Sequence, residues 1–392
     1  MAEKKDLAIT EGYGLAAGYT VVERATMRPI SAQGLGLQLD SSWALDRWGP
    51  GMRLSTDRSE KDITAAGARL WQAVKQCNDL LLERSDAMLL PGGSYPYTPI
   101  DERGSLSGAG EEQRSAPVRS GQSWTSGTTL EIPFADDPGF GRLHTAVRMV
   151  LPLLPALTAS SPFSGGLRST ALSARTASRI SGHPAIPQLT GSFIPELALD
   201  QADYYRIVLE PIALALADQG LSDRMDYHTV NARAAVPLFD RATLAVDLMD
   251  TQECASMDAA VAEMTAAVVQ AMKNGRWVSN YLQRAWHESD LLGILNEVVT
   301  MGREAVIDNR DFLLMFGKMR ESSTAGELWR HLYQQLREEL SEPTRIRIAH
   351  ILDHGNLAER ILRRIGDRPS PETLVSIYRE LAVHANEDRP FL

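Results

Sequence analysis

The chain has 392 residues, of which 44% are hydrophobic and 23% charged, a composition typical of a globular protein with a sizeable core. Fifty acidic residues against 40 basic ones give a formal net charge of -10, which disfavours nonspecific attraction to nucleic acid or to an anionic membrane. Cys77 and Cys254 form no metal-ligand spacing and no disulfide framework, and the first ten residues lack the apolar core of a secretory signal. We therefore expect a cytoplasmic protein with neither nucleic acid nor membrane as a partner.

The first third of the sequence predicts a strand, a helix and a loop. Alternation that ends in β-branched residues predicts a strand over 7–24, and apolar residues at helical spacing predict a helix over 60–84. Residues 103–127 hold 11 Gly or Ser among 25 residues without any period. This composition predicts a long mobile loop.

The middle of the sequence continues to mix strands with helices. We expect a short strand over 128–134, and then a helix that the prolines 152 and 155 interrupt. The segment 159–184, rich in Ser, Gly and Arg, predicts a loop. Residues 242–250 alternate as a strand does.

The last third of the sequence predicts helices. One helix is expected to begin with Ser256 as its N-cap and to end at Gly275, and the rest of the chain has helical periodicity, with Ser370 as a further cap. Strands mixed with helices and followed by a helical tail favour an α+β fold with an antiparallel sheet.

Five segments, taken in order, resemble the bacterial and plant-type glutamate-cysteine ligase family, whose members are also called carboxylate-amine ligases. The two longest are EIPFADDPGFGRLHTAVRMVLPLLPALTASSPFSGG and NARAAVPLFDRATLAVDLMDTQEC. The shorter ones are EGYGL near residue 11, LLPGGSYPY near residue 89 and HGNLAERILRRIG from His354. The resemblance therefore extends over most of the chain.

The resemblance implies a glutamine-synthetase-like curved antiparallel sheet with flanking helices and a helical C-terminal tail. Residues 1–275 would form the catalytic-type domain, and 276–392 a helical region packed on it. In such a ligase, magnesium-bound ATP phosphorylates a glutamate γ-carboxylate, which an amine then attacks. Carboxylates are needed to hold the magnesium, because the metal neutralises charge that develops during phosphoryl transfer.

The first strand lacks the carboxylates that the resemblance implies. The family has two glutamates there, on one face and ~6.6 Å apart along the strand. This chain has Ala16 and Gly18 at those positions. On the second strand a family histidine is replaced by Thr129, and a family asparagine by Glu131. Ligands of the kind that hold a metal are therefore missing from both strands.

The third strand departs in the same way. A family glutamate is replaced by Ala245, and a family arginine by Asp247, an anion that should repel ATP. Two less securely aligned positions carry Asp46 and Tyr95 in place of a family lysine and a family histidine.

The losses fall on one face of the predicted strands. Residues expected to face the core, namely Leu15, Leu130 and Val246, are still apolar. The alternate positions, which would face the site, have lost their chemistry. We interpret this pattern as a retained fold with a degenerate active site, since fold and function are separable.

Three arginines in the Ser-Gly segment are candidates for a ligand-binding remnant: Arg168, Arg175 and Arg179. Arginine binds carboxylate and phosphate in bidentate fashion, although a solvated loop face, which needs no ligand, is the favoured explanation of these residues. Arg175 lies where the family has an arginine, so it is the best candidate.

Three functions remain open. The leading one is a catalytically degenerate homologue with no cofactor, which acts as a structural or regulatory partner in a homo- or hetero-oligomer, with an intact ligase paralogue or a biosynthetic enzyme. The second is an active ligase that uses ATP and magnesium and has replaced its metal ligands with Glu131, Asp247 and Asp46. The third is a module that binds an amino acid or peptide without turnover.

Overall fold

The structure is a computed structural model, and the part of the chain that it describes is 12–32, 35, 43–48, 51–56, 61–97, 125–221, 230–366 and 368–392. Residues 43–48 are described by their backbone alone. The predicted loop over 103–127 lies outside the described residues except for its last three positions.

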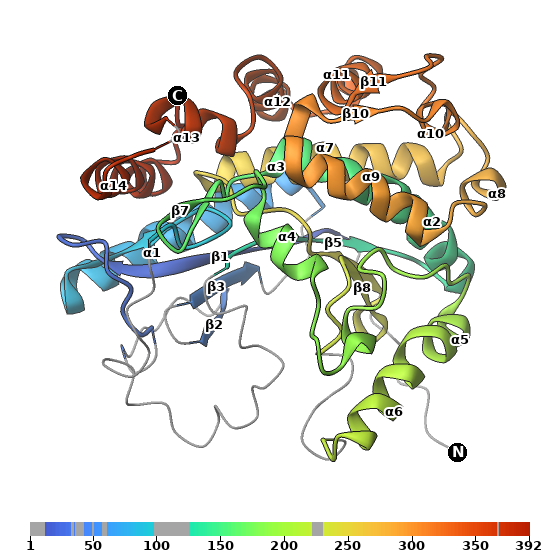
Figure 1. The fold of residues 1–392 in the computed structure, drawn as a ribbon, viewed down its shortest axis with the longest axis horizontal. Helices are drawn as coiled ribbons and strands as arrows, with labels where there is room; N and C mark the ends of the chain where they lie inside the picture. Colours follow the sequence, from blue (N-terminus) through green and yellow to red (C-terminus); the bar gives the residue numbers. More distant parts are fainter. Residues whose placement is uncertain are drawn as a thin grey trace.

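A seven-stranded antiparallel sheet lies at the centre of the fold (Figure 1). The strand order is β2-β3-β1-β5-β9-β8, and β4 pairs with the second half of β1. The strands are β1 (Gly14–Glu23), β2 (Trp43–Trp48), β3 (Gly51–Thr56), β4 (Ala87–Leu90), β5 (Thr128–Pro133), β8 (Ala235–Leu238) and β9 (Thr243–Val246). The predicted α+β class with an antiparallel sheet is confirmed.

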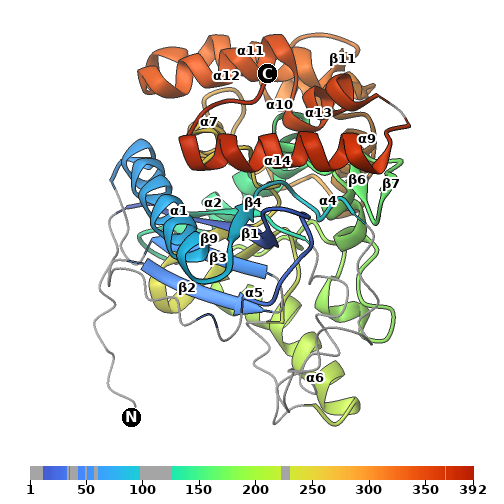
Figure 2. The same ribbon diagram turned by 90° about the vertical axis from the view of Figure 1, so that its left-hand side faces the viewer.

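Helices cover one face of this sheet. The main ones are α1 (Ile63–Ser85), α2 (Asp137–Val150) and α7 (Ala255–Lys273), and both α1 and α2 pack against α7. Figures 1 and 2 show α7 on one side of the sheet and α6 (Glu210–Asp218) on the other.

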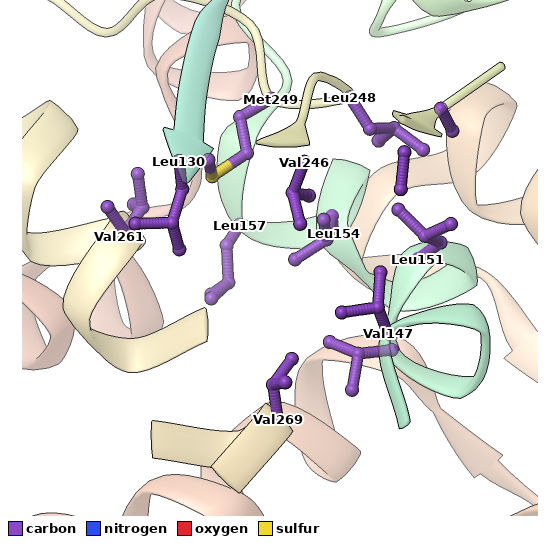
Figure 3. Packing of buried hydrophobic residues seen from close by; sticks show 14 of the residues in the cluster. Leu130, Val147, Leu151, Leu154, Leu157, Val246, Leu248, Met249, Val261 and Val269 are labelled. Atoms are coloured by element: carbon purple, nitrogen blue, oxygen red, sulfur yellow. The ribbon is translucent and has the colours of Figure 1, made fainter. Parts of the chain in front are cut away.

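The core lies between the sheet and these helices. Leu15, Leu130 and Val246 are at most 2% exposed and belong to this core, as their predicted orientation requires. In Figure 3, Leu130 and Val246 lie among apolar side chains of α7 and of the segment after α2. Burying a side chain of this size stabilises the fold by about 1.5–3 kcal/mol.

Further helices complete the structure. Near the sheet these are α3 (Leu154–Thr158), α4 (Ala174–Ile180) and α5 (Gln201–Tyr204). A π-helical turn joins α5 to α6. The C-terminal helices are α8 (Asn280–Gln283), α9 (Glu288–Met301), α10 (Arg310–Met315), α11 (Ala325–Leu336), α12 (Glu342–His354), α13 (Leu357–Ile365) and α14 (Pro371–Glu387). No helix within the described ranges has the length and apolarity needed to cross a membrane.

Two short two-stranded ladders were not predicted. One pairs β6 (Phe163–Ser164) with β7 (Leu167–Arg168), and the other pairs β10 (Val306–Ile307) with β11 (Ser323–Thr324). The region beyond residue 275 is therefore helical apart from one two-stranded ladder. Such two-residue strands carry too few positions for a period to be visible in the sequence.

The sequence analysis missed one helix and misplaced the start of another. The segment 159–184 contains helix α4, because the Ser173 side chain accepts a hydrogen bond from the Thr176 amide and caps it. Helix α7 begins one residue before the predicted cap, and Ser256 lies in its first turn. The Ser256 amide donates to Asp388 Oδ1 at 2.8 Å, so a residue far along the chain supplies the acceptor.

The C-terminal helices are fastened to the sheet by a fully buried ion pair. Arg360 of α13 contacts both carboxylate oxygens of Glu253, at 2.5 and 3.2 Å, and both side chains are 0% exposed. The Phe391 amide also donates to Glu253, and the Phe391 carbonyl accepts from Arg360. In Figure 2, α14 lies over β4, with which it packs.

Removing Arg360 should be strongly destabilising. The substitution Arg360→Met leaves the Glu253 carboxylate buried without a counterion, which costs about 3–5 kcal/mol of unfolding free energy. Urea denaturation measures this loss. As a control, Arg310→Met removes an ion pair with Glu321 in which both side chains are largely exposed, and it should cost less than about 1 kcal/mol. Equal losses in the two variants would contradict the assigned role of Glu253.

The buried carboxyl of Asp258 should make stability depend on pH. Burial raises the pKa of Asp258 to about 7, although Thr128 Oγ1 donates to it at 2.5 Å and the Gln252 amide at 2.9 Å. The folded state then binds the proton more tightly than the unfolded state does. The stability from this group is complete below about pH 4 and is lost as pH rises through about 7.

Asp258→Asn removes this titration. We expect the variant to gain stability relative to the wild type as pH rises from 5 to 8, in urea denaturation at both pH values. Asp240→Asn is the control, because Asp240 is exposed. Its stability relative to the wild type should not rise between pH 5 and pH 8. A pH-independent difference for Asp258→Asn would count against the raised pKa.

Candidate functional site

The positions predicted to be degenerate lie on one face of adjacent strands. Ala16 of β1 pairs with Thr129 of β5, and Thr129 Oγ1 donates to Asp247 Oδ1 at 3.2 Å, at the end of β9. In the next row, Glu131 of β5 pairs with Ala245 of β9. This face, which we call the site face, is opposite the one that packs on α7.

Gly18 lies on the site face and is not required there by packing. A Cβ built at Gly18 would meet Gly127 and Ser126 at 3.4 Å, which is an ordinary van der Waals contact. The Gly18 amide donates to the Gly127 carbonyl at 3.0 Å, and Thr251 Oγ1 donates to the Gly18 carbonyl at 3.0 Å. Close packing alone therefore does not explain a glycine at this position.

Asp247 is held by two arginines. Its Oδ1 lies 2.8 Å from Nη2 of Arg175, and its Oδ2 lies 3.4 Å from Nη2 of Arg179. Burial alone would raise the pKa of Asp247, but Arg179, Arg175 and Arg53 outweigh it and lower this pKa to about 2. Asp247 is thus ionised at any physiological pH, and its side chain is 33% exposed.

Arg175 is anchored by the backbone as well as by Asp247. Its side chain is 5% exposed, and Nη1 donates to the carbonyls of Leu248 and Met249 at 3.0 and 3.1 Å. A Cβ at Gly127 would lie 2.1 Å from Nη2 of Arg175, so only glycine allows the guanidinium to pack there. The residue predicted as a binding remnant is therefore fully engaged within the chain.

Asp250 fixes the segment that carries Arg175. Its Oδ2 accepts hydrogen bonds from the Ser160 amide at 3.0 Å, Ser161 Oγ at 2.7 Å and Ser173 Oγ at 3.0 Å. Its Oδ1 lies 3.8 Å from Nη1 of Arg175. Burial raises the pKa of Asp250, against the opposing effect of Arg175 and these donors.

The other two predicted arginines differ from each other. Arg179, on α4, is 8% exposed; it donates to the carbonyls of Asp247 and Arg233, and its guanidinium lies 5.2 Å from the ring centre of Phe193. Burial lowers the pKa of Arg179 to about 10, although Asp247 opposes this. Arg168 lies on β7, whose two residues are both exposed. The structure thus brings Arg175 and Arg179 together at Asp247.

The predicted alternative metal ligands do not form a common site. Glu131 lies 3.0 Å from Arg241 Nη2 and accepts a hydrogen bond from Thr243, whereas Asp247 is bound to Arg175 and Arg179. The side chain of Asp46 lies outside the described residues. Across the described ranges, no group of three or more His, Cys, Asp or Glu side chains could hold a metal ion.

The described residues of the site face do not form a magnesium site. Ala16, Gly18 and Ala245 offer no oxygen ligand, and the two nearby carboxylates are bound by guanidinium groups. An anion replaces the arginine that the resemblance implies. The carboxylates of the site face are therefore neutralised by arginines. Among the described residues, this face offers no set of oxygen ligands for a divalent cation.

Two further aromatic side chains are packed structurally. His144 is buried and packs against the rings of Phe140 and Tyr204, at 5.2 and 5.8 Å between ring centres, and burial lowers its pKa to about 3. Tyr95, which replaces a family histidine, donates to the Met27 carbonyl at 3.0 Å and packs beneath the C-terminal helices. Neither side chain belongs to the site face.

Comparisons with known proteins agree with this architecture. An uncharacterised protein from Archaeoglobus fulgidus is 25% identical over 253 residues, which cover 64% of this chain and 61% of that protein. A bifunctional glutathione synthetase from Pasteurella multocida superposes with a TM-score of 0.58 over 96% of this chain and 51% of that one. With 12% sequence identity, this second likeness concerns the fold alone.

The chain thus spans less than two thirds of the relative and about half of the solved structure. A family model described as glutamate-cysteine ligase family 2 matches residues 119–380, which is more than half of the chain. The matched residues include Asp250, the Ser-rich segment 159–184 whose serines contact it, and helix α13, which carries Arg360. The chain belongs to glutamate-cysteine ligase family 2.

Proposed function

We propose that the chain is a catalytically silent member of this family that acts as a structural or regulatory partner of another enzyme, with a competent ligase as the leading candidate. The observation that carries the proposal is the site face itself. Where the resemblance implies carboxylate ligands, Ala16, Gly18 and Ala245 present a methyl group, a hydrogen and a methyl group.

The energetics favour this function over a remodelled ligase. Electrostatic stabilisation by metal ions and fixed donors supplies several kcal/mol in phosphoryl transfer, and each ~1.4 kcal/mol lost slows a reaction about tenfold. Glu131 and Asp247 would have to leave their arginines before they could bind a cation. For Asp247, that exchange would leave two buried guanidinium groups unpaired, which is costly.

The retained interior supports a role that needs the fold but not the chemistry. The core beneath the sheet is continuous, and the buried charges of Asp250 and Glu253 keep their partners. Random decay of an unneeded protein would be expected to damage these buried groups as readily as the site face.

Calorimetry with magnesium and ATP tests the catalytic half of the proposal. We expect no saturable heat, and no ADP formation when glutamate and a panel of amines are added. Saturable binding with turnover would instead identify an active ligase. Thermal-shift screening with amino acids and peptides tests the third function, because a ligand specific for the folded state raises Tm.

A variant with restored ligands provides the matched control. Ala16→Glu, Gly18→Glu and Ala245→Glu together, with Asp247 kept because Arg175 and Arg179 bind it, should give the silent chain measurable magnesium-ATP binding. The same changes should weaken a ligase that already works with other ligands. Loss of binding in the restored variant, compared with the wild type, would therefore contradict the proposal.

Titration against a competent ligase of the same family tests the partner role. Sedimentation velocity should show a complex, and the ligase should change its kcat or KM at saturation with this chain. If neither association nor a change in rate occurs with any available family ligase, that choice of partner is wrong.

A further inference from the structure

We infer that Arg175 and Arg179 form a carboxylate-binding site whose ligand the chain supplies itself, as the side chain of Asp247. The inference deepens the proposed function and rests on it, because it assumes that the site face does not bind a substrate. Its test measures stability and anion binding, not catalysis, so either conclusion can fail while the other holds.

The contacts of Asp247 are those of a bound carboxylate. Each of its oxygens faces a different guanidinium, at 2.8 Å for Arg175 and 3.4 Å for Arg179, and Oδ1 also accepts from Thr129 at 3.2 Å. Two guanidinium groups and one hydroxyl are donors that proteins use to recognise free carboxylates.

The arginines are positioned without the help of Asp247's carboxylate. The carbonyls of Leu248 and Met249 hold Arg175, and its guanidinium packs against Gly127. Arg179 donates to two backbone carbonyls and packs on Phe193. Truncating the Asp247 side chain should therefore leave a preformed pair of donors.

No other described carboxylate can take the place of Asp247. Asp250 lies 3.8 Å from Arg175, but three serine donors already fix it. Arg53 lies on the site face across from Gly18, and it makes no hydrogen bond or ion pair with any side chain that the structure describes. Loss of Asp247 would thus leave three guanidinium groups with little compensation.

The site is open enough for a small ligand to enter. The Asp247 side chain is 33% exposed, although the two arginines that bind it are 5% and 8% exposed. A free carboxylate that replaces the missing side chain would therefore approach from solvent and meet largely desolvated donors. In such an environment a charge-assisted hydrogen bond is stronger than at an open surface.

The test is rescue of Asp247→Ala by acetate. The substitution should lower Tm by roughly 5 °C or more. Acetate should restore about half of that loss or more with a saturable dose dependence. Chloride at the same ionic strength should restore less. Acetate binding to the variant, and not to the wild type, should also be visible by calorimetry.

Three variants complete the design. Glu131→Ala removes a site-face carboxylate whose arginine, Arg241, is 43% exposed, so acetate should not affect its Tm beyond the wild-type response. Asp247→Asn keeps the volume filled and should not respond either. If Asp247→Ala alone does not fold, the double variant Asp247→Ala/Arg179→Met should fold and be insensitive to acetate, because it removes one uncompensated charge.

Two results would overturn the inference. One is a response of Asp247→Ala to acetate that is no larger than the responses of the wild type and Glu131→Ala. The other is a double variant that is no more stable than Asp247→Ala, since excess positive charge would then not be the cause of the loss.

Discussion

Three carboxylates in the eight residues after β9 hold the structure together, and each fastens a different part of the chain. Asp247 binds the arginines of α4, Asp250 binds three serines of the Ser-rich segments, and Glu253 binds Arg360 beneath the C-terminal helices. A buried carboxylate is costly unless its partners are in place. The position of one short segment therefore fixes α4, the serine segments and the C-terminal region at once.

This arrangement explains how the fold can persist without its family chemistry. Asp250 and Glu253 lie on the inner side of the segment and are fully buried, whereas Asp247 reaches the site face. Substitutions on the site face leave the two inner anchors untouched. Asp247 is an anion at the position where the resemblance implies a cation. Because Arg175 and Arg179 lie beside it, its carboxylate is attracted to its neighbours, whereas a cation there would be repelled. Stability and catalytic competence are thus separable here residue by residue.

The sequence was sufficient for three strands of the sheet, β1, β5 and β9, and for the orientation of their side chains. Strand alternation placed Ala16, Thr129 and Ala245 opposite the core, because the period of a strand is local. The long helices followed from apolar spacing. Helix α4 was missed, because seven residues rich in Ser and Arg show no apolar stripe, and the partners of its arginines lie about 70 residues away.

Long-range partners also account for the errors within the site. Arg175 was predicted as the best candidate for a ligand-binding remnant, and its sequence neighbours could not reveal the carbonyls of residues 248 and 249 or the carboxylate of Asp247. The cap of α7 was assigned to Ser256 for the same reason. Predictions that depended on a local period agree with the structure. Predictions that depended on which distant group is the partner of a donor do not.

The acceptor for the first turn of α7 has a consequence for how the polypeptide matures. Asp388 and the amide of Phe391 reach back over more than 130 residues to Ser256 and Glu253, at the start of the central helix. These groups are therefore synthesised more than 130 residues after the segment that they complete. Until they are present, the emerging sheet has an incomplete covering layer, so its final closure follows the synthesis of α14.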